Sequence, residues 1–182
     1  PGMTSSSFLQ YLTLCESDED QKRFNHLLYR WNSYQVDLLG VNQQAAMPKK
    51  IYKSKVKNSK IRIAFISADF KDHSVARFIQ PLFLFLDRSK YDLVGYYTQC
   101  REDEWTQFFV DKTIVFRNIS KSSPKELMNY VQEDEVDVLF DLTGFTAGSR
   151  VGALAQRMAP IQISWLGFPG STGLENMDYL YL

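Results

Sequence analysis

Short runs of apolar residues alternate with helix-like stretches over the last two thirds of the chain. The first run, Ile61–Ile66, is nearly continuous, as expected of a strand that is buried on both faces. The alternation of strand and helix predicts an α/β fold, a Rossmann-like doubly wound parallel sheet with right-handed crossovers. The further strands are expected over residues 91–98, 113–116, 136–142, 161–166 and 177–182.

Capping residues locate the helices between these strands. A helix is expected over residues 74–87, where Asp72 or Ser74 can cap the first amides and Pro81 either kinks the helix or shifts its start. Another helix begins at the segment Ser123–Glu126, because this segment reads as a capping box with proline at the first helical position.

The first 59 residues have a different pattern. Ser17, followed by three acidic residues, predicts the start of a helix that has one apolar stripe and ends near Gly40. We assign residues 1–41 to a helical linker segment and residues 42–59, which carry five lysines, to a basic linker. Residues 60–182 form the sheet domain.

Charge and cysteine content argue against several classes of function. The 21 acidic and 21 basic residues balance, which disfavours a large surface for nucleic acid or anionic membrane. Cys15 and Cys100 lie too far apart to suggest a disulfide framework or a zinc site. No apolar run approaches the roughly 20 residues that span a bilayer, and the amino end lacks a secretory pattern. We therefore expect a cytoplasmic protein.

Three loops follow predicted strands at the same edge of the sheet: residues 69–73, 143–149 and 167–173. Each is rich in Gly, Ser, Thr or Asp. Because the carboxyl ends of parallel strands converge, we expect these loops to form a composite ligand site. Glycines permit positive φ, so amides of the last loop could hold an anion or sugar hydroxyls. The same pattern also fits glycines that serve only tight turns.

His73 is the candidate for chemistry in the first loop. An imidazole can exchange a proton or form hydrogen bonds near neutral pH, which suits catalysis. The other histidine, His26, lies in a predicted helix and is interpreted as a surface or packing residue. No second His or Cys lies near His73, so no metal site is predicted. The glycine spacing matches neither a dinucleotide fingerprint nor a phosphate loop, which disfavours a flavodoxin-like nucleotide binder.

Three motifs, ISADFKDHSVARF, DLTGFTAGSR and APIQISWLGFPGSTGLENMDY, resemble in order and spacing the amino-terminal catalytic half of the O-GlcNAc transferase family. The resemblance is strongest to bacterial-type members with tetratricopeptide repeats, and it covers residues 61–182. It implies the amino-terminal half of a GT-B fold, in which two Rossmann-like halves enclose the active site. It also implies that the sequence stops before the UDP-binding half, and that the helices before Gly40 belong to the region after the repeats.

The resemblance further implies a reaction. Members of the family transfer N-acetylglucosamine, or a related sugar, from a UDP donor to Ser or Thr hydroxyls of proteins with inversion. The donor would be UDP-N-acetylglucosamine, bound mainly by the missing half, the partner would be an acceptor protein or peptide, and no metal or other cofactor is expected. A diphosphate leaving group needs electrostatic stabilisation that the missing half supplies. We therefore expect this polypeptide alone to be inactive.

The resemblance also assigns roles to residues. His73 matches the histidine of the family's DFxxH motif and would act as general base or as a contact to acceptor or donor. Residues 144–146 match a turn that lines the cleft, with Phe145 where the family usually has Tyr or His, so that a polar contact is lost. Residues 169–172 match a loop close to the bound sugar. The alternative is a non-catalytic protein- or peptide-binding module that uses the same loops. The predicted substrate-binding residues are Asp69, Gly144, Phe145, Thr146, Pro169, Gly170, Ser171 and Thr172.

Overall fold

A computed structural model describes residues 10–11, 13–38, 59–168 and 170–181. Six strands form one sheet in the order β3-β2-β1-β4-β5-β6, and every neighbouring pair is parallel. The predicted Rossmann-like doubly wound sheet is therefore confirmed. The strands are β1 (Ile61–Ser67), β2 (Tyr91–Tyr97), β3 (Val115–Asn118), β4 (Val138–Asp141), β5 (Ile161–Trp165) and β6 (Tyr179–Tyr181).

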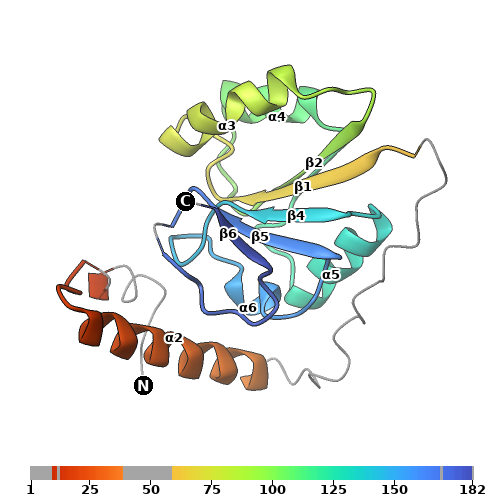
Figure 1. The fold of residues 1–182 in the computed structure, drawn as a ribbon. Coiled ribbons are helices and arrows are strands. Elements are labelled where there is room, and N and C mark those ends of the chain that lie inside the picture. The colour runs from red at the N-terminus through yellow and green to blue at the C-terminus, as the bar shows by residue number, and fades with distance from the viewer. Residues whose placement is uncertain (1–9, 12, 39–58, 169, 182) are drawn as a thin grey trace.

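Helices cover both faces of the sheet (Figure 1). On one face lie α3 (Ser74–Phe85) and α4 (Glu104–Lys112), and on the other lie α5 (Pro124–Glu133) and the short α6 (Val151–Leu154). The long helix α2 (Asp18–Leu38) runs past α6 on that second side. None of the helices in the described part of the chain is long and apolar enough to cross a membrane.

The core has two layers, one on each face of the sheet. Alternate residues of β1 supply both layers, because Ala64 and Ile66 pack toward α5 and α6 whereas Phe65 packs toward α3. The layer beneath α3 and α4 is aromatic, and Phe65 lies 5.1 Å from the ring of Phe140 and 5.2 Å from that of Phe83. Burial on both faces explains why the sequence of β1 shows an apolar run rather than alternation.

The helix α2 shares the core of the sheet. Phe24 and Leu28 are buried in the same cluster as Ala64 and Ile66. The rings of Trp31 and Phe145 pack edge to face, with 5.3 Å between their centroids. The division into a helical segment and a sheet domain remains a prediction, and the predicted basic linker lies outside the described residues except for Ser59.

Three strands begin later than the sequence pattern predicts, and the fourth strand is one of them, since it begins at Val138 rather than at residue 136. The third begins at Val115, because Thr113 still closes the end of α4 through a hydrogen bond from its amide to the carbonyl of Val110. The sixth begins at Tyr179, because residues 174–178 form a turn in which the Met177 amide donates to the Leu174 carbonyl.

Candidate functional site

The order of the strands reverses between β1 and β4, and the loops that follow these two strands meet there. The amide of Leu142 donates to the carbonyl of Ile66 at 2.9 Å, and the amide of Ala68 donates to Oγ1 of Thr143 at 3.2 Å. In open parallel sheets, ligands bind at this point. The first two predicted loops are therefore held together at the edge where a ligand site is expected.

The third loop joins the same edge through very close backbone packing. A Cβ atom placed on Gly167 would lie 1.8 Å from the carbonyl oxygen of Leu142, so only glycine fits there. The next residue, Phe168, is buried against Gly144, whose own added Cβ would lie 2.3 Å from the Phe168 side chain. The predicted convergence of all three loops is confirmed.

His73 is both exposed and structurally engaged. Its side chain is 43% exposed, and its Nδ1 accepts a hydrogen bond of 3.2 Å from the amide of Val75 in the first turn of α3. The expectation that Asp72 or Ser74 would cap this helix is wrong. The Asp72 carboxylate instead pairs with Arg77 on the surface.

Asp69 lies beside His73. Its Oδ2 atom is 3.6 Å from the Nδ1 atom of His73, and its side chain is only 15% exposed. Burial raises the pKa of the Asp69 carboxyl above its ordinary value, while the neighbouring side chains of His73 and Lys71 act in the opposite direction. The pair of Asp69 and His73 is the polar group that the first loop places at the edge of the sheet where the three loops meet. We call this edge the crevice.

Asp141 is a site residue that sequence reasoning missed. It ends β4, is 1% exposed, and its carboxylate accepts hydrogen bonds from the amides of Thr143 at 3.0 Å and Gly144 at 3.1 Å. Burial raises its pKa to about 6, although the two amides favour the charged form. An aspartate two residues before a Thr-Gly pair is a signal that could have identified this role.

The predicted cleft-lining turn is divided between the core and the surface. Phe145 is 0% exposed and packs between Trp31 and Phe168, with ring centroids at 5.3 and 5.2 Å. Its side chain therefore anchors the turn and does not line the surface of the crevice. Thr146 is partly exposed, and its hydroxyl donates to the carbonyl of Thr143 at 2.7 Å. Gly144 has a positive φ of 55°, which the turn requires.

Arg150 fixes the far end of this loop and was also missed. Its Nη2 atom donates to the carbonyl oxygens of Ile119 at 2.6 Å and Ser120 at 3.1 Å, just after β3. Burial lowers the pKa of its guanidinium. Arg150 therefore ties the second loop to the carboxyl end of a distant strand.

Residues 169–172, which match the family's loop close to the bound sugar, are called the sugar loop here. The structure describes Gly170, Ser171 and Thr172 but not Pro169. Ser171 is exposed and its hydroxyl accepts a hydrogen bond from the amide of Gly173 at 3.0 Å, whereas Thr172 is buried. A small hollow of about 90 Å³ lies beside this loop. It is lined by Ser164, Ser171, Thr172, Leu174, Met177, Asp178, Tyr179 and Leu180.

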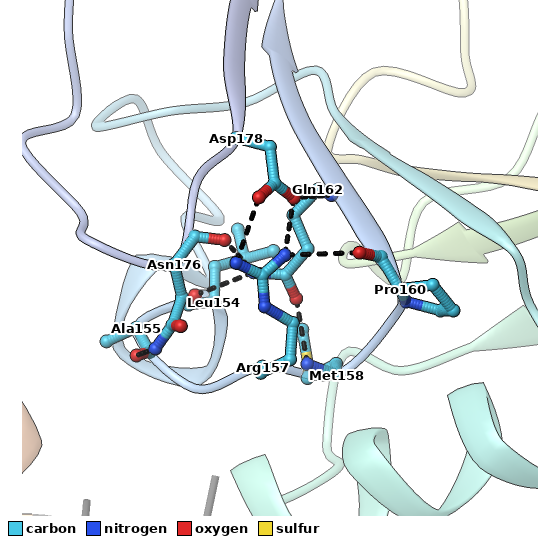
Figure 2. A network of polar contacts seen from close by, with 8 residues as sticks. All are labelled: Leu154, Ala155, Arg157, Met158, Pro160, Gln162, Asn176 and Asp178. Carbon is cyan, nitrogen blue, oxygen red and sulfur yellow. Dashed lines mark hydrogen bonds and ion pairs between the residues drawn. The ribbon is translucent and has the colours of Figure 1, made fainter. Parts of the chain in front are cut away.

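A buried polar network holds the segment that follows the sugar loop (Figure 2). The guanidinium of Arg157 forms a two-point ion pair with Asp178, with 3.0 Å between Nη2 and Oδ1. Asp178 also accepts from the amide of Gln162 at 2.8 Å, and the Gln162 side chain donates to the carbonyl of Asn176 at 2.8 Å. The network joins the end of α6, the start of β5 and the turn before β6. Within the described residues, no cluster of three or more His, Cys, Asp or Glu side chains could hold a metal ion.

The sequence profile of glycosyl transferase family 41 matches residues 32–182. The chain belongs to glycosyl transferase family 41. The resemblance to O-GlcNAc transferases that the three motifs indicated is thereby confirmed. The match includes the three loops described above and part of α2.

Similar proteins carry transferase names. The probable UDP-N-acetylglucosamine–peptide N-acetylglucosaminyltransferase SPINDLY of Arabidopsis thaliana is 39% identical over 123 residues, which cover 65% of this chain and 14% of that protein. The corresponding probable transferase SEC of the same plant is 30% identical over 122 residues, or 66% of this chain and 12% of that protein. The chain therefore spans only a small part of the length of these relatives.

A solved structure extends the similarity to the fold. A mutant of the Thermobaculum terrenum O-GlcNAc transferase superposes with a TM-score of 0.80 and 25% sequence identity, and it covers 97% of this chain and 32% of that chain. The superposition spans nearly the whole chain, so the helical segment is included with the sheet. The sheet thus has the arrangement found in the catalytic region of an O-GlcNAc transferase.

Proposed function

We propose that this chain is the amino-terminal catalytic part of an inverting glycosyltransferase that moves N-acetylglucosamine, or a related sugar, from UDP to Ser or Thr hydroxyls of proteins. The observation that carries the proposal is the family match over a region whose three loops converge at one edge of the sheet. The names of the relatives, UDP-N-acetylglucosamine–peptide N-acetylglucosaminyltransferases, suggest the donor and the peptide acceptor.

In such a transfer, the acceptor oxygen attacks the anomeric carbon, the bond to the diphosphate breaks, and the hydroxyl proton passes to a base. His73 is exposed at the crevice and supports a role as base or as substrate contact. Asp69 lies close enough to modulate either role. Thr146, Gly170 and Ser171 would shape the sugar side of the crevice, while the buried Gly144, Phe145 and Thr172 act from beneath it.

The developing charge on the diphosphate requires cationic or amide partners. At the crevice, Arg150 is engaged by the backbone carbonyls of Ile119 and Ser120. We therefore propose that a carboxy-terminal half supplies these partners, that no metal is used, and that this chain alone transfers no sugar. A cytoplasmic location and a preceding tetratricopeptide array are part of the same proposal.

Calorimetric titration of this chain with UDP and with UDP-N-acetylglucosamine tests whether the donor is bound mainly by the carboxy-terminal half. A transfer assay on the full-length protein tests the reaction. We expect no detectable binding of either nucleotide by the chain, together with transfer by the full-length protein. Clear binding that His73→Ala abolishes would show that the donor site is largely built here. Peptide binding by the full-length protein without any transfer would instead favour the non-catalytic module.

A further inference from the structure

The two nitrogen atoms of the His73 ring have different surroundings. Nδ1 accepts the hydrogen bond from the Val75 amide at 3.2 Å, and this bond caps α3. Nε2 forms no hydrogen bond with any residue that the structure describes, and the side chain is exposed. The ring therefore turns one nitrogen toward the protein and leaves the other for solvent or a ligand.

The bond to Nδ1 determines where the proton lies on a neutral imidazole. A neutral ring has one nitrogen that accepts and one that donates, and the partner of one nitrogen fixes the state of the other. Because the Val75 amide can only donate, Nδ1 must be the acceptor, so the proton is on Nε2. An Nε2–H group is a hydrogen-bond donor and cannot take a proton from a hydroxyl.

Asp69 is a neighbour that could reverse this state. A carboxylate favours a proton on the nitrogen that faces it, and the Oδ2 atom of Asp69 lies 3.6 Å from Nδ1. That separation exceeds the usual hydrogen-bond range of about 2.7–3.2 Å, whereas the amide of Val75 lies within it. The position of the Val75 amide is also fixed by α3. We therefore expect this amide, rather than the Asp69 carboxylate, to determine which nitrogen of His73 carries the proton.

We infer that His73 presents Nε2–H to the crevice and serves the transfer as a hydrogen-bond donor to a substrate oxygen, while the acceptor hydroxyl gives its proton to another group. The role in transfer rests on the proposed function, whereas the position of the proton can be measured without any substrate. Of the two roles that the resemblance left open for His73, the helix cap selects the substrate contact.

The position of the proton is testable by ¹⁵N NMR of the histidine rings in this chain. At a pH at which both rings are neutral, we expect a pyridine-type Nδ1 and a pyrrole-type Nε2 in His73, with a scalar coupling across the hydrogen bond to the Val75 amide. His26 is the internal control, because it is exposed on α2. The preference for Nε2–H should exceed that of His26 by about fivefold, the factor that a capping hydrogen bond contributes.

Asp69→Asn is the matched variant for this measurement. If the hydrogen bond from the Val75 amide fixes the tautomer of His73, the preference for a proton on Nε2 persists in Asp69→Asn. A pyrrole-type Nδ1 in the wild type that is lost in Asp69→Asn would overturn the inference, because Asp69 would then hold His73 in the tautomer that can act as a base.

The role in transfer is tested separately in the full-length protein. Glutamine can place a donor near the position of Nε2 but cannot accept a proton as a base. We expect His73→Gln to retain at least about tenfold more activity than His73→Ala, the worth of one hydrogen bond to a charged or strongly polar group. Equal losses in the two variants would overturn the donor role. Absence of transfer by the wild type would instead refute the proposed function, and the NMR result would still locate the proton.

Discussion

The first and second loops of the crevice are built in opposite ways. The first exposes its functional group, since His73 is a surface residue held by one hydrogen bond to α3. The second is held in place by buried residues, since Asp141 and Phe145 are both buried. This difference predicts that changes in the second loop act mainly on stability, whereas changes in the first act mainly on function.

The largest effect on stability is expected from Phe145→Ala. Phe145 is completely buried between Trp31 and Phe168, and removal of such a ring costs about 3–5 kcal/mol of unfolding free energy. Urea denaturation would measure the loss. The exposed Phe78 on α3 is the matched control, and Phe78→Ala should change the unfolding free energy by less than about 0.5 kcal/mol. Equal effects of the two changes would remove the contrast between buried and exposed positions.

Gly167→Ala should come next, with a loss of about 3 kcal/mol. The new Cβ would lie 1.8 Å from a backbone carbonyl oxygen, which cannot move aside as a flexible side chain would. The exposed Glu175 in the following turn provides the control, and Glu175→Ala should be nearly neutral. If Gly167→Ala melted at the wild-type temperature, the third loop could not be packed against Leu142 as described.

The raised pKa of Asp141 should make the unfolding free energy depend on pH. Its pKa is raised from 3.8 to about 6 in the folded state, so the folded protein binds more protons than the unfolded protein between these values. By linkage, this component of stability is complete below about pH 4 and is lost as the pH rises through 6. Its size is about 3 kcal/mol, at 1.4 kcal/mol for each pKa unit.

Urea midpoints of the wild type and Asp141→Asn at intervals from pH 4 to pH 7 would measure this component. We expect the wild type to lose stability relative to the variant as the pH rises. Asp69→Asn serves as the comparison, because burial raises the pKa of that carboxyl in the same direction. Parallel curves for the wild type and Asp141→Asn would show that Asp141 titrates in its ordinary range.

The smallest effect on stability is expected at His73. His73→Ala removes the cap of α3 and should cost about 1 kcal/mol of unfolding free energy. Asp72→Ala removes only an exposed pair with Arg77 and should cost less than about 0.5 kcal/mol. The reverse order in a thermal or urea denaturation series would mean that the cap belongs to Asp72, one of the two residues, with Ser74, that the sequence predicted.

Local sequence was sufficient where the interactions are local. The capping box at Ser123 and Glu126 forms as predicted, with Ser123 Oγ accepting from the Glu126 amide and Glu126 Oε2 accepting from the Ser123 amide at 2.7 Å. The apolar run of β1 likewise predicted a strand buried on both faces. The order of strand and helix then limited the topology, so the edge at which the three loops meet was predictable.

The tertiary structure decided which residues of these loops face the crevice. Phe145 is withdrawn into the core because Trp31, on a helix far away in the sequence, supplies the packing surface. His73 rather than Asp72 occupies the N-cap position of α3, and the Asp72 carboxylate pairs with Arg77 instead. Asp141 has a raised pKa because the layers around β4 exclude water. The sequence by itself determined the elements and their order, since these depend on neighbours a few positions apart. Burial and ring contacts depend on atoms that only the folded sheet brings together.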